Sequence, residues 1–103
     1  MGNDMGDCAI TNTAESPHCR LKSVDLQSVK WTKGFWANRF RQCVEVTLPH
    51  LWDFASDPDK GHVLANLRIA AGLEEGEFVG THWQDAWLYK WLEAASAVHG
   101  VTP

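Results

Sequence analysis

The segment from Phe78 to Ala95, FVGTHWQDAWLYKWLEAA, contains three of the six tryptophans of the chain at a spacing of four residues. Trp83, Trp87 and Trp91 fall on one stripe of a helix, because this spacing follows the 3.6-residue period and not the alternation of a strand. A buried indole needs a hydrogen-bond partner, whereas an exposed indole is a platform for the apolar face of a sugar ring. The stripe predicts either a packed helical layer or the wall of a carbohydrate groove.

Around this stripe the sequence predicts short elements with clear ends. The last helix is predicted to begin near Gln84 and Asp85, where the Asp85 carboxylate can stabilise the first backbone N–H groups, and to end near residues 99–100. Residues 73–80 form an acidic, glycine-containing loop before it. A shorter helix is predicted over residues 62–71, with Gly72 as its left-handed cap.

The preceding part of the chain predicts a longer helix behind an extended arm. Residues 24–31 are predicted as a strand or arm, and residues 35–55 as the helix, followed by a polar loop over 56–61. One face of that helix carries its large apolar side chains: Trp36, Phe40, Val44, Leu48 and Leu51. Pro49 interrupts the pattern, and a kink or break is expected near Thr47 and Leu48 because proline removes a hydrogen bond.

Composition limits the domain organisation. The 103 residues suffice for one domain, and the hydrophobic content of 45% favours a packed core. Residues 1–23 are polar and aperiodic, which predicts a flexible lead-in, and residues 24–103 form the helical segment. The expected fold class is all-α. Because no apolar run marks a signal peptide or a membrane anchor, we expect a cytoplasmic protein without a membrane partner.

Charge and cysteines argue against two further classes of site. The net charge is −4, from 13 acidic and 9 basic residues, and the basic residues form no stripe, so nucleic acid is not an expected partner. Cys8, Cys19 and Cys43 are an odd number and lack a CxxC spacing. They fit neither a disulfide framework nor a closed zinc site, and no metal ligand is assigned.

The residues alone indicate no catalytic constellation. Asp85 and Glu93 lie eight residues apart on one predicted helix. That spacing is about 12 Å along the axis, too long for the carboxylate pair of a retaining or inverting glycosidase. The histidines of the helical segment are isolated from one another, and a lone histidine is more often structural than catalytic: His50, His62, His82 and His99. No catalytic residue is assigned.

The order of several short motifs resembles a known enzyme family. The motifs are VKWTKGFW at 29–36 followed by Arg39, NLRIAAG at 66–72, FVG at 78–80, and Asp85 followed by KWLEA at 90–94. In this order they resemble the N-terminal portion of glycoside hydrolase family 127, the β-L-arabinofuranosidase-like family. The likeness covers roughly residues 24–99.

The resemblance implies an (α/α)6 barrel, of which these helices would be the opening hairpins, and a retaining hydrolase acting on β-linked L-arabinofuranose. It also implies a cysteine nucleophile at a zinc site of cysteines and a glutamate, so zinc is expected in an intact member. None of the three cysteines here matches that motif, and no cofactor is assigned to this chain. The residues expected to approach a sugar are those at the loop-to-helix junction: His82, Trp83, Gln84 and Asp85. The alternative is that they pack against the next hairpin.

Two functional hypotheses follow from the sequence. The first is a partial β-L-arabinofuranosidase-like hydrolase that is inactive alone, binds an L-arabinofuranose-type glycoside when the barrel is completed, and self-associates through its uncovered aromatic faces. The second is a self-sufficient small helical module that binds a carbohydrate or a protein.

Overall fold

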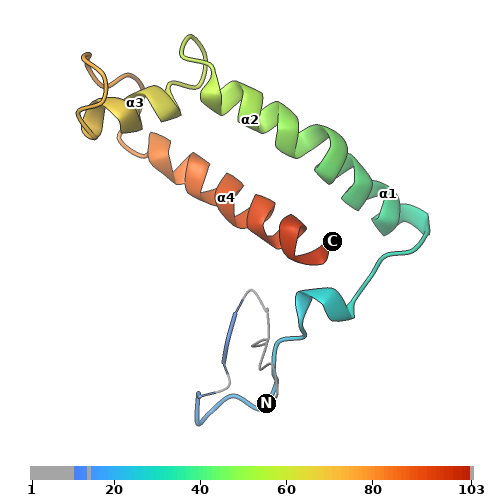
Figure 1. Cartoon of the computed structure of the whole chain (residues 1–103). Helices are drawn as coiled ribbons and strands as arrows, with labels where there is room; N and C mark the ends of the chain where they lie inside the picture. Colours follow the sequence, from blue (N-terminus) through green and yellow to red (C-terminus); the bar gives the residue numbers. More distant parts are fainter. Residues whose placement is uncertain (1–10, 14, 103) are drawn as a thin grey trace, which may run out of the picture.

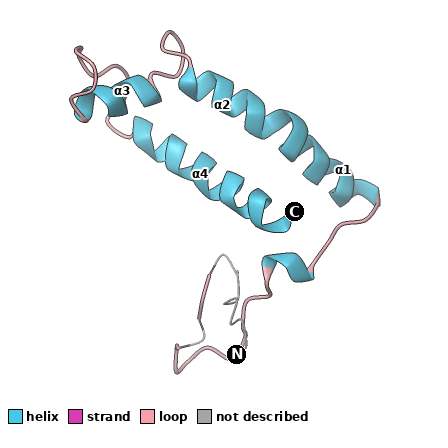
Figure 2. Ribbon diagram, in the orientation of Figure 1, coloured by secondary structure: helices cyan, strands magenta, loops and turns pink. Residues whose placement is uncertain are grey.

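The computed structural model describes residues 11–13 and 15–102, and all regular structure in these residues is helical (Figure 2). The elements are η1 (Leu26–Ser28), α1 (Gly34–Gln42), η2 (Cys43–Thr47), α2 (Leu48–Ser56), α3 (Val63–Ala70) and α4 (Gln84–Val101). The all-α prediction is confirmed for this part of the chain. The last helix lies within about one residue of its predicted bounds, a normal uncertainty for helix ends.

The three segments α1, η2 and α2 follow one another as a long helical run, and α4 returns antiparallel beside α2 (Figure 1). Helix α3 lies across one end of this pair, where it contacts both α2 and α4. The arm with η1 lies at the other end, against the C-terminal part of α4 (Figure 1). The result is a helical hairpin that is packed at the α3 end and open at the α1 end.

Pro49 does not break the long helix. It lies in the first turn of α2, where its missing N–H is not needed, and η2 before it is a π-helical turn in which the Leu48 N–H donates to the Cys43 carbonyl. The Thr47 hydroxyl adds a bond to the Gln42 carbonyl at 3.4 Å. Because Thr47 and Leu48 both keep right-handed helical dihedrals, the predicted kink or break is instead a change of hydrogen-bond register.

The strand alternative for residues 24–31 is wrong, because the segment forms the single 3-10 turn η1. Asp25 caps this turn, and its carboxylate accepts a hydrogen bond from the Gln27 N–H at 3.1 Å. A local bond of this kind competes with strand pairing. Of the predicted lead-in, residues 1–10 and 14 lie outside the described residues. Flexibility of residues 1–23 stays a prediction.

Helix α3 confirms the prediction for residues 62–71, and Gly72 ends it as predicted, with a φ of 71°. The Leu73 N–H bonds the Arg68 carbonyl at 2.8 Å and the Gly72 N–H bonds the Ile69 carbonyl at 2.9 Å, the two bonds of a Schellman motif. Only a left-handed residue closes this pair, which is why glycine stands there. The motif turns the chain into the loop 73–83 that precedes α4.

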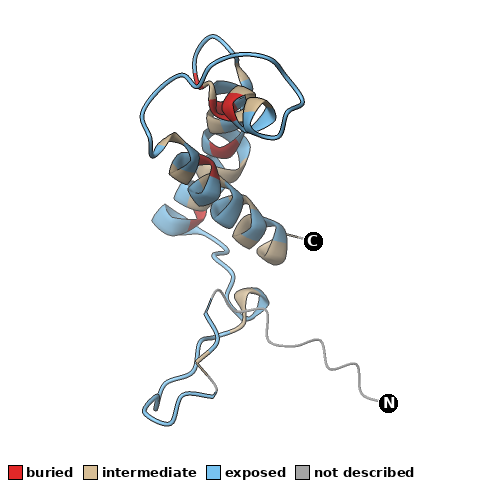
Figure 3. Ribbon diagram, turned by 90° about the vertical axis from the view of Figure 1, so that its left-hand side faces the viewer, coloured by how far each residue is buried: buried red, intermediate tan, exposed pale blue. Residues whose placement is uncertain are grey.

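Burial is uneven along the hairpin (Figure 3). The buried side chains around α2, α3 and α4 include Ala55, Val63 and Leu88. Of the apolar face predicted for the first long helix, Leu48 is buried, whereas Trp36 remains 65% exposed. That face is therefore a core surface only in its C-terminal half. Among the described residues, no helix has both the length and the hydropathy that a membrane span requires.

Candidate functional site at the loop-to-helix junction

The four residues predicted to approach a sugar lie where the loop 73–83 enters α4. His82 and Trp83 end the loop, and Gln84 and Asp85 open the helix. A tight turn sets their orientation, because the Gln84 N–H bonds the Thr81 carbonyl at 3.0 Å and the Ala86 N–H bonds the Trp83 carbonyl at 3.1 Å. Trp83 is the N-cap residue and makes no side-chain capping bond.

The structure divides these four residues between two cavities. His82 and Asp85 line a cavity of about 220 Å³ together with α3 residues and Phe78. Trp83 and Gln84 line a different cavity of about 450 Å³, with Phe54 and residues of the first two turns of α4. The four residues therefore do not all line one cavity.

Gln84 has a structural role that its position in the sequence did not indicate. Its amide Nε2 donates to the Gly61 carbonyl at 3.1 Å, and its Oε1 accepts from the Thr81 hydroxyl at 3.2 Å. Gly61 is buried against α2, and a side chain there would overlap the Phe54 carbonyl. Gln84 thus ties the start of α4 to the loop between α2 and α3.

Asp85 is not the N-cap of α4, because it stands two residues after the capping position. In the first turn its charge is still favourable toward the positive end of the helix dipole. A hydrogen bond to the Asp85 carboxylate and its negative charge together raise the pKa of Tyr89 above its ordinary value, since both favour the protonated phenol. Asp85 therefore interacts with Tyr89, one turn later on the same helix.

His82 and Trp83 form the exposed part of the junction. Their rings meet edge to face with centroids 4.8 Å apart, and the Trp83 side chain is 61% exposed. An indole held by a neighbouring ring and open to solvent offers a flat apolar surface. Of the four predicted residues, these two present aromatic rings at the surface of the junction.

Asn66 holds the loop that carries this junction. The side chain is buried on α3, and its amide donates to the Val79 carbonyl at 2.7 Å while its carbonyl oxygen accepts from the Val79 N–H at 3.0 Å. The side chain thus satisfies both backbone groups of a loop residue that has no helical partner. Sequence reasoning missed this role. The available signal was a single amide among the apolar residues of a short helix.

The tryptophan stripe has two different environments. The Trp91 indole N–H donates to the Leu48 carbonyl at 2.9 Å, and its ring lies 4.8 Å from the Trp52 ring. Trp87 contacts Phe54 with centroids 5.5 Å apart and remains 39% exposed. The packed alternative is confirmed at the C-terminal end of the stripe, which lies on α2. At the N-terminal end Trp83 faces solvent, and the carbohydrate groove stays a prediction there.

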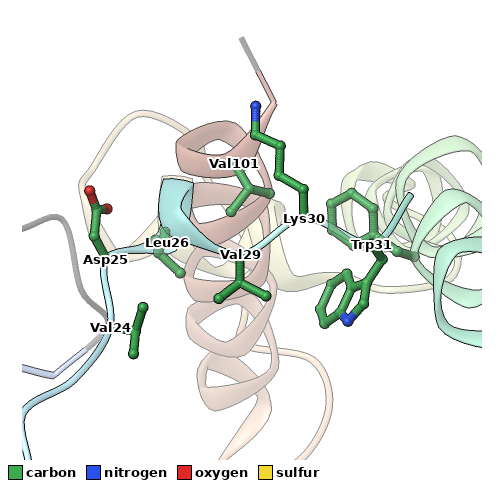
Figure 4. A pocket seen from close by; sticks show the side chains of 8 residues that line it. Val24, Asp25, Leu26, Val29, Lys30, Trp31 and Val101 are labelled. Carbon is green, nitrogen blue, oxygen red and sulfur yellow. The ribbon is translucent and has the colours of Figure 1, made fainter. Parts of the chain in front are cut away.

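A third cavity of about 320 Å³ lies beneath the arm, between Trp31, Phe40 and the last turn of α4. Figure 4 shows the apolar side chains of Val24, Val29 and Trp31 on one side of the arm. The Asp25 carboxylate and the Lys30 ammonium lie on the other side (Figure 4). Asp25 and Lys30 are nevertheless among the residues that line the cavity, and the rest of its lining is apolar.

Comparison with known proteins decides the family. Residues 28–103 match the family described as β-L-arabinofuranosidase, GH127 catalytic domain. The chain belongs to glycoside hydrolase family 127. A curated relative, the non-reducing end β-L-arabinofuranosidase of Bifidobacterium longum subsp. longum, is 38% identical over 85 residues, which cover 67% of this chain and 13% of the relative. No solved structure matches.

Family 127 membership confirms the resemblance seen in the motif order, and the matched region contains every described helix from α1 onward as well as the loop junction. The chain spans 13% of the length of the relative. The junction and the hairpin are thus one part of a family 127 catalytic domain, and the functional groups of this part must be judged from its own residues.

The described residues do not fit the zinc site expected in an intact family 127 member. Among them, no group of three or more histidine, cysteine and acidic side chains is placed to hold a metal ion. Cys19 is exposed in the lead-in, where its thiol donates to the Leu21 carbonyl, and Cys43 lies half-buried in η2. Cys8 lies outside the described residues. No chemical step is therefore derived through a metal.

The carboxylates of this family 127 segment occupy separate places. Asp85 and Glu93 both lie on α4, as the sequence predicted, and both are exposed. In the acidic loop, Glu74 forms an ion pair with the Arg68 guanidinium, and both side chains are well exposed. An exposed pair of this kind contributes little to stability.

Proposed function

We propose that this chain supplies a helical segment of a β-L-arabinofuranosidase-type glycoside hydrolase and does not turn over substrate by itself. The single observation that carries the proposal is the family 127 match over residues 28–103, in a chain that spans 13% of a named β-L-arabinofuranosidase. The reacting groups then belong to other parts of the catalytic domain. This segment contributes packed helices and the loop junction.

The proposed architecture is the opening hairpin of an (α/α)6 barrel. The antiparallel pairing of α2 with α4 supports it, because such hairpins are the repeating unit of helical barrels. Exposed aromatic side chains on the long helix and on α4 support it as well, since an isolated domain seldom leaves so many uncovered. Further hairpins would cover them.

The proposed substrate is an L-arabinofuranose-type glycoside, contacted at the junction by His82 and Trp83. The edge-to-face contact between the two rings and the exposure of Trp83 support this role. A furanose presents an apolar face that can stack on an indole and hydroxyl groups that an imidazole can bond. The cytoplasmic location is part of the same proposal, and cell fractionation tests it.

Activity on an aryl β-L-arabinofuranoside, with zinc and reductant present, tests the proposal. We expect no turnover by the 103-residue chain and normal turnover by the Bifidobacterium longum relative, which serves as the positive control. Robust turnover by this chain alone would overturn the proposal.

A chimera tests the role of the junction directly. In it, the 85 matched residues of the relative are replaced by the corresponding residues of this chain. We expect the chimera to hydrolyse the substrate, and Trp83→Ala in it to raise KM, because a stacking surface is lost. Trp36→Ala is the comparison, since Trp36 lies on α1 away from the junction. It should lower the stability of the chimera, where another hairpin would cover Trp36, and leave KM unchanged. An inactive but folded chimera would contradict the proposal.

A second function, a self-sufficient helical binding module, is favoured by one observation. At the α3 end, the Asn66 and Gln84 side chains form hydrogen bonds with backbone groups of the neighbouring loops. This part of the hairpin therefore satisfies these polar groups without any additional segment. Size-exclusion chromatography with light scattering and thermal melting separates the two functions. A monodisperse species with a sharp transition supports the module, and a self-associating species with a broader transition supports the partial hydrolase.

A further inference from the structure

Two cavities between α2 and α4 are parts of one groove. One has a volume of about 240 Å³ and is lined by Leu48, Leu51 and Ala94 among others. The other is the cavity of about 450 Å³ beside Phe54. Trp87 and Lys90 line both, which joins the two cavities along the same side of the hairpin. The α2–α4 groove is defined here by Leu48, Leu51 and Phe54 on α2 and by Trp87, Lys90 and Ala94 on α4.

The α2–α4 groove has the dimensions of a helix-binding site. Its α4 wall reaches from Trp87 to Ala94, which is about 10 Å at the rise of an α-helix. That length accommodates about two turns of a second helix. The lining is apolar, with an aromatic ring near the middle, and an amphipathic helix typically places its apolar face into such a groove.

Lys90 sets the charge of the groove. Among the described residues, it is the only ionisable one that lines either cavity. The ion pairs formed within the described part of the chain join Lys60 to Asp57 and Arg68 to Glu74, and neither includes Lys90. Because Lys90 borders both cavities, this residue lies between the two stretches of the groove. The complementary surface is one carboxylate flanked by apolar side chains.

We propose that the α2–α4 groove binds an amphipathic helix from the remainder of the family 127 catalytic domain, with a carboxylate of that helix facing Lys90. The inference rests on the proposed function. The length of the relative supports this occupant, because 13% of it corresponds to this chain and the rest is available to cover the groove. Lys90 supports an acidic helix over a wholly apolar one.

A second copy of the chain fits the groove less well. In a two-fold symmetric dimer the same surface meets itself, so residues near the centre of the groove face their own copies. Lys90 lies near that centre, since it borders both cavities. Two ammonium groups would then meet across a desolvated contact, which opposes association.

Binding is measured between the full 103-residue chain and the Bifidobacterium longum relative from which the 85 matched residues have been removed. The two are co-expressed, the complex is isolated through a tag on this chain, and Kd is determined by titration of the separated partners. Circular dichroism establishes that both partners are folded. We expect a one-to-one complex. Absence of a complex between folded partners would overturn the proposal.

One pair of variants locates the contact. Ala94→Arg fills the groove from α4 and should weaken binding at least about tenfold, the size of effect seen at the centre of an interface. Ser96→Arg adds the same charge to an exposed position on the opposite side of α4 and should leave Kd within about twofold. Equal effects of the two variants would place the contact elsewhere and overturn the proposal.

The charge of the partner is tested at Lys90. Lys90→Glu should weaken binding more than Lys90→Gln, because it places a carboxylate against a carboxylate. If Lys90→Glu binds as well as the unchanged chain, an acidic occupant is excluded. A discrete dimer of this chain that Ala94→Arg dissociates would identify a second copy as the occupant instead.

Hydrolysis by the same complex separates this inference from the proposed function. If the complex cleaves an aryl β-L-arabinofuranoside but Ala94→Arg leaves Kd unchanged, the groove proposal fails and the hydrolase proposal stands. If Ala94→Arg weakens a complex that cleaves nothing, the groove proposal stands and the hydrolase proposal fails.

Discussion

The α3 end and the α1 end of the hairpin contain similar kinds of residue but differ in how their surfaces are covered. At the α3 end, Val63, Leu88 and Asn66 are buried, and the polar groups there are paired across elements. At the α1 end, Phe35 and Trp36 remain mostly exposed although their rings contact each other. Aromatic content alone therefore does not produce a core. A face is buried only where a second element returns along it.

The largest expected effect is at the core of the α3 end. Leu88→Ala should lower the free energy of unfolding by about 2–5 kcal/mol, because Leu88 is 5% exposed and the substitution leaves a cavity. Leu92→Ala, one turn later on α4 and 47% exposed, is the matched control and should cost far less. Urea unfolding followed by circular dichroism measures both. Equal losses of unfolding free energy in the two variants would show that Leu88 and Leu92 do not differ in burial in solution.

The next largest effect on stability is expected from the Asn66 clamp, the pair of hydrogen bonds between the Asn66 side chain and the Val79 backbone. Asn66→Ala leaves the Val79 N–H and carbonyl without their partners and should cost about 1–3 kcal/mol for each group that stays buried. Asn38→Ala, on the exposed side of α1, is the control and should change stability by at most about 0.5 kcal/mol. Amide exchange at Val79 should rise in the Asn66 variant. Unchanged protection there would contradict the clamp.

The indole bond between α4 and α2 should have a smaller effect. Trp91→Phe keeps an aromatic ring but removes the donor to the Leu48 carbonyl, at an expected cost of about 1 kcal/mol. Trp87→Phe, which leaves that bond in place, provides the comparison. If the two variants unfold at the same urea concentration, the Trp91 hydrogen bond does not contribute measurably.

At the α1 end, truncation of a tryptophan should leave the free energy of unfolding almost unchanged. Trp36→Ala is expected to change the free energy of unfolding by no more than about 0.5 kcal/mol, because Trp36 is mostly exposed. A buried tryptophan truncated in this way typically costs about 3–5 kcal/mol. A loss in that range, measured on the chain alone, would show that α1 is covered in solution and would refute the open description of this end.

The smallest effect concerns Tyr89, the only tyrosine in the chain. Asp85 raises the pKa of Tyr89, so its phenolate should form at higher pH in the folded chain than in denaturant. A raised folded pKa contributes stability that is fully present below the unfolded value of about 10 and is lost as pH rises through the folded value. Asp85→Asn should lower the midpoint in a phenolate absorbance titration. An unchanged midpoint would mean that Asp85 does not act on Tyr89.

The sequence by itself determined the helices, their order and the family. These features are read from local signals: the hydrophobic period, the glycine after α3 and the order of the motifs. Such signals do not require tertiary contacts, because helix periodicity and helix caps depend on residues close in sequence. The same signals located the irregularity before Pro49. They did not reveal that a π-helical turn would accommodate this irregularity, because the turn depends on which backbone carbonyl accepts each N–H.

Only the tertiary structure decided what the individual side chains do. The four junction residues are consecutive in sequence, yet the structure assigns two to each of two cavities, because neighbours on a helix point in different directions. Gln84 and Asn66 became structural through partners 23 and 13 residues away. In the tryptophan stripe, Trp91 is half-buried and bonded to α2, whereas Trp83 is open surface, because α2 runs beside one end of the stripe and not the other. The burial of a side chain depends on which other segment of the chain packs against its helix, and a local sequence pattern does not specify that segment.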